Sequence, residues 1–161
     1  MLRIGKNRAC RPAGLARDAV RMAYHFSDHA GGIAVRLRGR TREALFASAA
    51  LAFTDCITPL TGVEPRRPEE LALDAPELDL LLVDFLSELL YRFDTRAWLT
   101  CSANVGVREL DGGWTLEGTL SGEKLDVARH PIKRLITAVT YRGLQVIERD
   151  GEWHADVRFE R

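Results

Sequence analysis

The sequence has little of what marks several familiar classes of protein. Cysteine occurs only three times, at Cys10, Cys56 and Cys101, a wide spacing that excludes a short zinc motif and fits reduced thiols. No apolar run approaches the roughly 20 residues of a membrane-spanning helix. The 23 basic and 23 acidic side chains cancel, so the overall charge favours neither nucleic acid nor an anionic membrane as a partner. We expect a cytoplasmic protein that associates with no membrane.

The positive charge is unevenly placed, because basic side chains crowd residues 1–21, where only Asp18 is acidic. This stretch has the charges of the first region of a signal peptide but no apolar segment behind them, so we do not expect secretion. We interpret residues 1–21 as a basic, flexible N-terminal extension. Residues 22–161 are interpreted as a single domain, which suits this length.

Hydrophobic periodicity predicts two helices. Apolar side chains share one helical face within residues 45–56, with Thr41 as the N-cap and Pro59 beyond the end. A second and wider apolar stripe covers residues 78–93, and Pro76 suits the first position of that helix. We expect this second helix to be the main core helix.

Alternation of apolar and polar residues predicts the strands. Residues 111–113 (Asp-Gly-Gly) and 150–151 (Asp-Gly) favour hairpin turns, because these residue types tolerate positive φ. The predicted strands are 33–38, 71–73, 98–107, 114–120, 136–147 and 153–159. With both helices early and the long hairpins late, the chain is predicted to be an α+β domain. We expect a two-layer sandwich in which two main helices cover one face of a mostly antiparallel sheet.

Four separated landmarks carry a resemblance to a known family. Residues 28–32 read Asp-His-Ala-Gly-Gly before the first predicted strand, and the Leu-rich second helix ends in Leu-Leu-Tyr-Arg-Phe-Asp at 89–94. His130 precedes an Ala-Val-Thr-Tyr stretch at 138–141, and Glu160 is an acid near the C-terminus. Together these features resemble the archease family, of which the chain is identified as a divergent member. The resemblance implies the archease fold for the single domain.

The resemblance also implies a site for a divalent cation, because in archeases the opening motif and the C-terminal acid supply carboxylates to a metal. Carried over to this chain, the metal ligands are Asp28 and Glu160. Gly32 stands where the family has a second Asp, so one carboxylate is missing. Leu135 and Thr137 stand where archeases usually have Glu and Lys. With these charges lost, we expect binding of Ca²⁺ or another divalent cation to be weak or absent.

Other residues are candidates for contacting a partner or supporting the site. His29 matches the second position of the opening motif, and Asp126 and His130 keep the Asp-x-x-x-His spacing that archeases have before the late strand. Asp156 shares a polar strand face with Glu160, because residues four apart in a strand point the same way. If calcium does bind, Asp156 is a replacement ligand beside Asp28 and Glu160, but we slightly favour an ordinary solvated face as the explanation of this pattern.

The resemblance implies an accessory protein of an RtcB-type tRNA-splicing RNA ligase, one that promotes guanylylation and multiple turnover of the ligase. We expect no catalysis by the chain itself, since it has no nucleophile elbow, phosphate-binding loop or zinc motif. One alternative is a chaperone-like or scaffold module that binds another protein and has lost ligase activation. A third is direct RNA binding, which we do not expect, because aromatic residues spaced for base stacking are absent.

Overall fold

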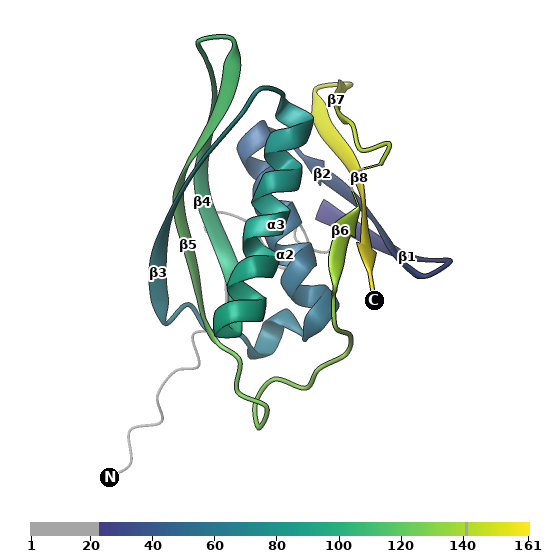
Figure 1. The fold of residues 1–161 in the computed structure, drawn as a ribbon, viewed down its shortest axis with the longest axis vertical. Coiled ribbons are helices and arrows are strands. Elements are labelled where there is room, and N and C mark those ends of the chain that lie inside the picture. The colour runs from purple at the N-terminus through teal and green to yellow at the C-terminus, as the bar shows by residue number, and fades with distance from the viewer. Residues whose placement is uncertain (1–22, 141) are drawn as a thin grey trace.

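The computed structural model describes residues 23–140 and 142–161. The predicted extension at 1–21 therefore lies outside the described residues, as does Tyr141 of the late motif. The described residues form two antiparallel sheets with two long helices between them (Figure 1). No helix in this part of the chain is long and apolar enough to cross a membrane.

The larger sheet has five strands in the order β1-β2-β8-β6, with β7 also paired to β8. Its strands are β1 (Tyr24–His29), β2 (Gly32–Gly39), β6 (Ala138–Thr140), β7 (Val146–Arg149) and β8 (Glu152–Glu160). The smaller sheet has the order β3-β5-β4. Its strands are β3 (Arg67–Ala75), β4 (Trp98–Leu110) and β5 (Gly113–Lys124). The helices are α2 (Arg42–Ile57) and α3 (Leu78–Arg96), with the short 3-10 helix η1 (Leu60–Gly62) after α2.

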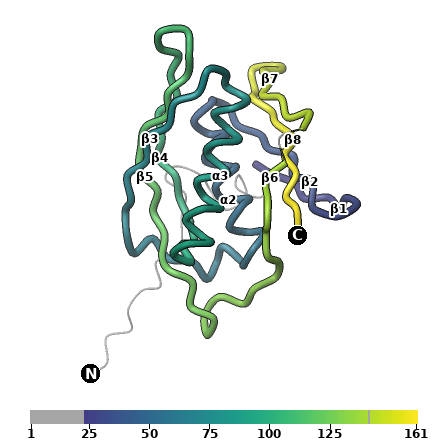
Figure 2. The backbone as a smooth tube through the Cα atoms, in the orientation of Figure 1, coloured from purple at the N-terminus to yellow at the C-terminus, as the bar shows by residue number. Residues whose placement is uncertain are grey.

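The α+β class, the two main helices and the antiparallel pairing are confirmed. The layering differs from the prediction, because the strands form two sheets and the helices are covered on both sides (Figure 2). The reason lies in α2, whose residues 49–53 are all buried and so leave no polar face. A helix that is apolar all round must be covered all round. Phe46 accordingly packs on Phe85 of α3, while Phe53 packs on Phe159 of β8.

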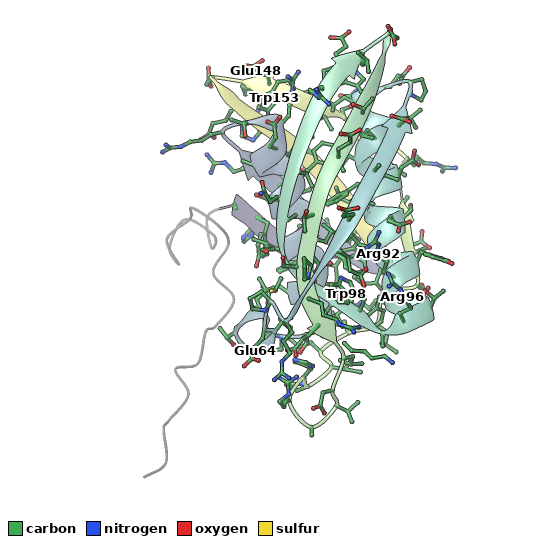
Figure 3. The ribbon with its side chains drawn as sticks, turned by 90° about the vertical axis from the view of Figure 1, so that its left-hand side faces the viewer. Glu64, Arg92, Arg96, Trp98, Glu148 and Trp153 are labelled. Atoms are coloured by element: carbon green, nitrogen blue, oxygen red, sulfur yellow. The ribbon has the colours of Figure 1, made fainter. Side chains whose placement is uncertain are left out.

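Helix α3 is fastened to β3 by a cluster of ion pairs. The buried Arg92 guanidinium lies 2.6 Å from Glu69 of β3 and 2.7 Å from Glu88 of α3. Arg96 donates two hydrogen bonds of 2.9 Å to the same Glu69 carboxylate. Figure 3 shows Arg92 and Arg96 close together near one end of the helix. One acid of β3 therefore fixes the last turns of α3 against the smaller sheet.

Three details of the predicted elements are wrong. Pro76 precedes α3 instead of opening it, since Glu77 is the N-cap. A residue before proline favours extended backbone, which suits Ala75 as the end of β3. The predicted strand 136–147 is divided into β6 and β7 by a turn in which Gly143 has a φ of 74°. The predicted strand 71–73 extends over the nine residues of β3.

The N-cap and both predicted hairpin turns are confirmed. Thr41 accepts a hydrogen bond of 3.0 Å from the Ala44 amide at the start of α2. Asp111 and Gly112 have φ values of 51° and 75°, and residues 150 and 151 have 52° and 76°. Two consecutive positive φ values define the turn that best matches the twist of paired strands.

Candidate functional site

The turn of the first hairpin and the C-terminus meet at one end of the larger sheet. Asp28 lies opposite Ile33 of β2, which lies opposite Phe159 of β8, while Gly32 lies opposite Glu160. The sequence analysis predicted no strand before residue 33, and this is wrong, because residues 24–29 form β1 and the hairpin turn to β2 needs only two residues. We call the residues that end β1 and β8, from 28 to 32 and from 159 to 161, the tip.

The two carboxylates that the resemblance assigns to a metal lie on opposite faces of the tip. Residues directly opposite each other in an antiparallel pair project to the same face, and neighbours along a strand alternate. Asp28 therefore shares the helix-facing side with Ile33 and Phe159, whereas Glu160 shares the outer side with His29. The tip brings these residues together in the sheet but does not aim their carboxylates at one point.

Each carboxylate has a partner of its own. Glu160 accepts a hydrogen bond of 2.7 Å from the Thr140 hydroxyl, and the largely exposed Asp28 lies 3.7 Å from the Arg161 guanidinium. Asp156 shares the outer face with Glu160, but four residues of strand separate them by about 13 Å. Asp156 pairs with Arg36 at 3.3 Å instead. The arrangement does not bring Asp156 to the tip.

The backbone around Gly32 leaves no room for the side chain that would supply the missing carboxylate. A Cβ atom at this position would overlap the carbonyl oxygen of Phe159, because β2 and β8 run close together there. Within the described residues, no group of three or more His, Cys, Asp and Glu side chains is placed to hold a metal ion. Ca²⁺ takes about six to eight oxygen ligands. As they stand, the side chains of the tip do not fit that shell, and the strength of calcium binding stays a prediction.

His130 is the centre of a buried polar cluster away from the tip. Its side chain is inaccessible to solvent, and its Nδ1 accepts a hydrogen bond of 2.9 Å from the Asp126 amide. Because Nδ1 accepts, the ring proton belongs on Nε2, which lies 2.9 Å from the Glu123 carboxylate and 3.0 Å from the Gly62 carbonyl. His130 therefore joins η1, the end of β5 and the loop that follows, and it presents no surface to a partner.

Glu123 is the carboxylate to which several donors of this cluster bind. Besides His130, it accepts a hydrogen bond of 2.9 Å from the Glu64 amide and one of 2.7 Å from Arg129. Arg66 lies 3.0 Å away. Burial raises the pKa of Glu123, but the hydrogen bonds outweigh burial and leave the pKa below its ordinary value. No spacing in the sequence pointed to Glu123, since its partners come from other segments of the chain.

Asp126 closes the loop beside His130. Its carboxylate accepts a hydrogen bond of 3.0 Å from the Ala128 amide and one of 3.2 Å from Arg129. The Ala128 amide, followed by Arg129, holds the pKa of Asp126 below its ordinary value. The Asp-x-x-x-His spacing seen in the sequence therefore closes the loop. The Asp126 carboxylate accepts a hydrogen bond from the Ala128 amide, and the His130 ring accepts one from the Asp126 amide.

The segment 125–137 connects this cluster to the tip, and we call it the connecting loop. Figure 2 shows its backbone leaving β5, passing below both helices and reaching β6 beside the C-terminus. It is anchored by hydrogen bonds from the Lys133 amide to the Ile57 carbonyl (2.7 Å) and from the Thr137 amide to the Glu160 carbonyl (2.9 Å). Along its length the connecting loop exposes three apolar side chains, Val127, Ile132 and Leu135.

Asp55 of α2 ties the connecting loop to the first hairpin. Its carboxylate accepts a hydrogen bond of 3.0 Å from the Tyr24 hydroxyl of β1 and lies 3.2 Å from the Lys133 ammonium. Burial raises the pKa of Tyr24, and the nearby Asp55 raises it further. Sequence reasoning missed Asp55, because a single acid on an apolar helix carries no spacing that points to partners on β1 and the loop.

These features define a class of α+β domain: two sheets around two helices, with the first hairpin, the C-terminus and a long loop gathered at one end. The solution structure of Methanobacterium thermoautotrophicum protein 1598 has the same fold, with a TM-score of 0.77 and 28% identity, covering 86% of this chain and 99% of that one. The crystal structure of a Thermotoga maritima archease, described as a possible chaperone, has a TM-score of 0.54. It covers 84% of this chain and 94% of its own, and at 14% identity it shows the fold alone.

The sequence comparisons identify the family. The model of the Archease protein family (MTH1598/TM1083) matches residues 24–160. The archease of Methanosarcina barkeri is 35% identical over 135 residues, covering 83% of this chain and 92% of that protein. The archease of Methanopyrus kandleri is 33% identical over 135 residues, covering 84% of this chain and 96% of that protein. The chain belongs to the archease family.

Proposed function

We propose that this protein is an accessory factor of an RtcB-type tRNA-splicing RNA ligase, which it helps to become guanylylated and to turn over repeatedly. The chain catalyses no bond chemistry in this proposal. Family membership supports the accessory role. The observation that carries a protein-binding role is the connecting loop, which is held at both ends by buried or backbone contacts and still exposes three apolar side chains.

An ordered apolar surface is suited to docking. A loop that is already fixed loses little conformational entropy on binding, and burying its apolar side chains then stabilises the complex. Val127, Ile132 and Leu135 lie on the same loop as the half-buried cation Arg134. The ligase surface that fits is therefore apolar with an acidic rim. The tip lies at the far end of the loop, so Asp28 and His29 reach the same partner.

The test compares two leucines that are equally exposed. Leu135 of the connecting loop is 56% exposed, and Leu110 in the β4–β5 hairpin is 57% exposed. Figure 1 shows that this hairpin lies at the opposite end of the molecule from the loop. Multiple-turnover RNA joining by the ligase of the same organism should be stimulated by the wild type and by Leu110→Ser, but several-fold less by Leu135→Ser. Equal stimulation by both variants would contradict a role for the loop.

A second candidate function is a chaperone-like or scaffold module that binds proteins other than the ligase. Leu135 favours it, because an apolar residue stands where the family resemblance expects a charged one. The assay is heat-induced aggregation of a model protein such as citrate synthase, followed by light scattering. If this function holds, the wild type and Leu110→Ser suppress aggregation and Leu135→Ser does not, while none of the three stimulates the ligase.

A further inference from the structure

The outer face of the larger sheet carries a hollow that the proposed accessory role does not use. This face is turned away from the helices, and the hollow has a volume of about 540 Å³. Strands β2, β7 and β8 form its floor and sides, together with the segment that contains Gly143. Its polar lining consists of Arg36, Arg38, Gln145, Arg149, His154 and one acid, Asp156. We call it the arginine basin.

The register of the strands brings these arginines together. Arg38 lies opposite His154 across the β2–β8 pair, and Arg149 lies opposite Glu152 across the β7–β8 pair. Strand β8 therefore lies between Arg38 and Arg149, which, with their offset of two residues along the strands, places their backbones about 12 Å apart. Arg36 follows on β2, two residues and about 7 Å from Arg38 on the same face. Three guanidinium groups from two strands thus surround one hollow.

The guanidinium groups are open to a ligand. Arg36 pairs with Asp156 at 3.3 Å and Arg38 pairs with Glu152 at 2.8 Å, and all four side chains are exposed to solvent. Exposed pairs of this kind contribute little and exchange readily with other anions. Arg149 makes no ion pair within the described residues. The basin is locally positive even though acidic side chains outnumber basic ones over the described part of the chain.

The chemistry of the lining favours phosphate. Arginine binds phosphate through two parallel hydrogen bonds, and the amide of Gln145 adds a neutral donor. Among the residues that the structure describes, the side chains lining the basin include no Phe, Tyr or Trp on which a base could stack. The separation of Arg36 and Arg38 along β2 is close to that of successive phosphates in an extended single strand. We propose that the arginine basin binds phosphate groups of the RNA backbone, without reading its sequence.

This proposal reverses the expectation that the protein makes no direct contact with nucleic acid. That expectation depended on the zero net charge and on arginines that are scattered through the sequence. Pairing of β2, β7 and β8 gathers them, because alternation sends Arg36, Arg38 and Arg149 to one face. The basin lies away from the connecting loop, so RNA and a protein partner can be bound together. Binding of RNA does not depend on the ligase role.

The experiment is fluorescence anisotropy of a labelled single-stranded oligouridine with the full-length protein over a range of salt concentrations. The double variant Arg38→Gln/Arg149→Gln removes two phosphate contacts, so we expect about tenfold weaker binding and a log–log salt slope reduced by about 1.4 for a single strand. The control is Arg108→Gln, an exposed arginine of the smaller sheet, and it should bind like the wild type. Thermal unfolding followed by circular dichroism verifies that all variants are folded.

Competition distinguishes the sources of phosphate. RNA that is displaced by unlabelled oligouridine but not by GTP at equal phosphate concentration identifies the RNA backbone as the ligand, whereas displacement by both identifies a general phosphate site. Three results would overturn the proposal. The first is that neither RNA nor GTP binds at about 100 µM protein. The second is that the double variant binds RNA as well as the wild type, which is what binding by the basic residues 1–21 alone would produce. The third is that polyglutamate displaces the RNA as well as oligouridine does.

Discussion

Replacing Glu123 with alanine should be among the most damaging single changes in this protein. The carboxylate is almost completely buried, and it accepts hydrogen bonds from the Glu64 amide, from Arg129 and from His130. The variant leaves the Glu64 amide and the Nε2–H of His130 with fewer acceptors in the interior. It also leaves Arg129 without its main partner. The connecting loop loses the anchor at its β5 end.

The expected loss of unfolding free energy follows from the groups that stay buried when the Glu123 carboxylate is removed. Removing one partner of a buried ion pair costs about 3–5 kcal/mol of unfolding free energy, since the other groups remain buried and unpaired. Arg129 is partly exposed and can regain water, which places the expected loss near the lower limit, about 3 kcal/mol. The matched control is Glu117→Ala, whose partner Arg108 is 3.8 Å away with both side chains exposed. An exposed pair contributes about 0–1 kcal/mol.

The assay is urea unfolding at pH 7, followed by far-ultraviolet circular dichroism. Hydrogen exchange of the loop amides should also accelerate in Glu123→Ala. A loss below 1 kcal/mol, or one equal to that of Glu117→Ala, would refute the assignment of Glu123 as the anchor.

The stabilisation by Glu123 has a defined pH dependence. Its pKa is lower in the folded state than in the unfolded state, so the ionised form is bound more favourably by the native protein. The contribution is complete above the unfolded pKa of glutamate, about 4.3, and it is lost as the pH falls through the folded pKa. The difference in stability between the wild type and Glu123→Ala should therefore be constant near neutral pH and shrink below about pH 4.

Three further predictions concern other parts of the fold. Gly32→Asp restores the family residue but should destabilise the protein by about 1–3 kcal/mol in urea unfolding and create no calcium site in calorimetry, because its Cβ overlaps the Phe159 carbonyl. Burial raises the pKa of the Cys56 thiol, so Cys56 should react with a thiol reagent such as DTNB only as fast as the protein unfolds. Tyr24→Phe should cost about 1.5–3 kcal/mol, and urea unfolding at several pH values should show this loss shrinking above about pH 10, where the hydroxyl of the unfolded chain ionises while that of the folded protein, with its raised pKa, stays protonated.

The parts of the fold that periodicity could predict are those set by neighbours in sequence. The apolar stripe of α3, the Thr41 cap of α2 and the two Asp-Gly hairpin turns each depend on a few adjacent residues, and each is present. The division into two sheets depends on which element covers which. The consecutive buried residues 49–53 of α2 were the available signal, since small and apolar side chains on every side indicate a helix covered all round.

The candidate site was predicted less completely, because its geometry is long-range. The family resemblance indicated that Asp28 and Glu160 would converge, and strand pairing does bring them to one tip. It could not indicate that they project to opposite faces, which follows from the register of three strands. Glu123 and the arginine basin were missed for the same reason. Their residues come from separate segments, and no spacing in the chain records that β7 and β2 flank β8.

We propose that this protein activates an RNA ligase without catalysing a reaction itself. The most direct measurement is the rate at which the ligase of the same organism becomes covalently labelled by radioactive GTP, with and without an equimolar amount of this protein. We expect faster labelling of the ligase with the wild type and with Leu110→Ser, slower labelling with Leu135→Ser, and no label on the protein itself. An unchanged rate with folded wild-type protein would contradict the proposed function.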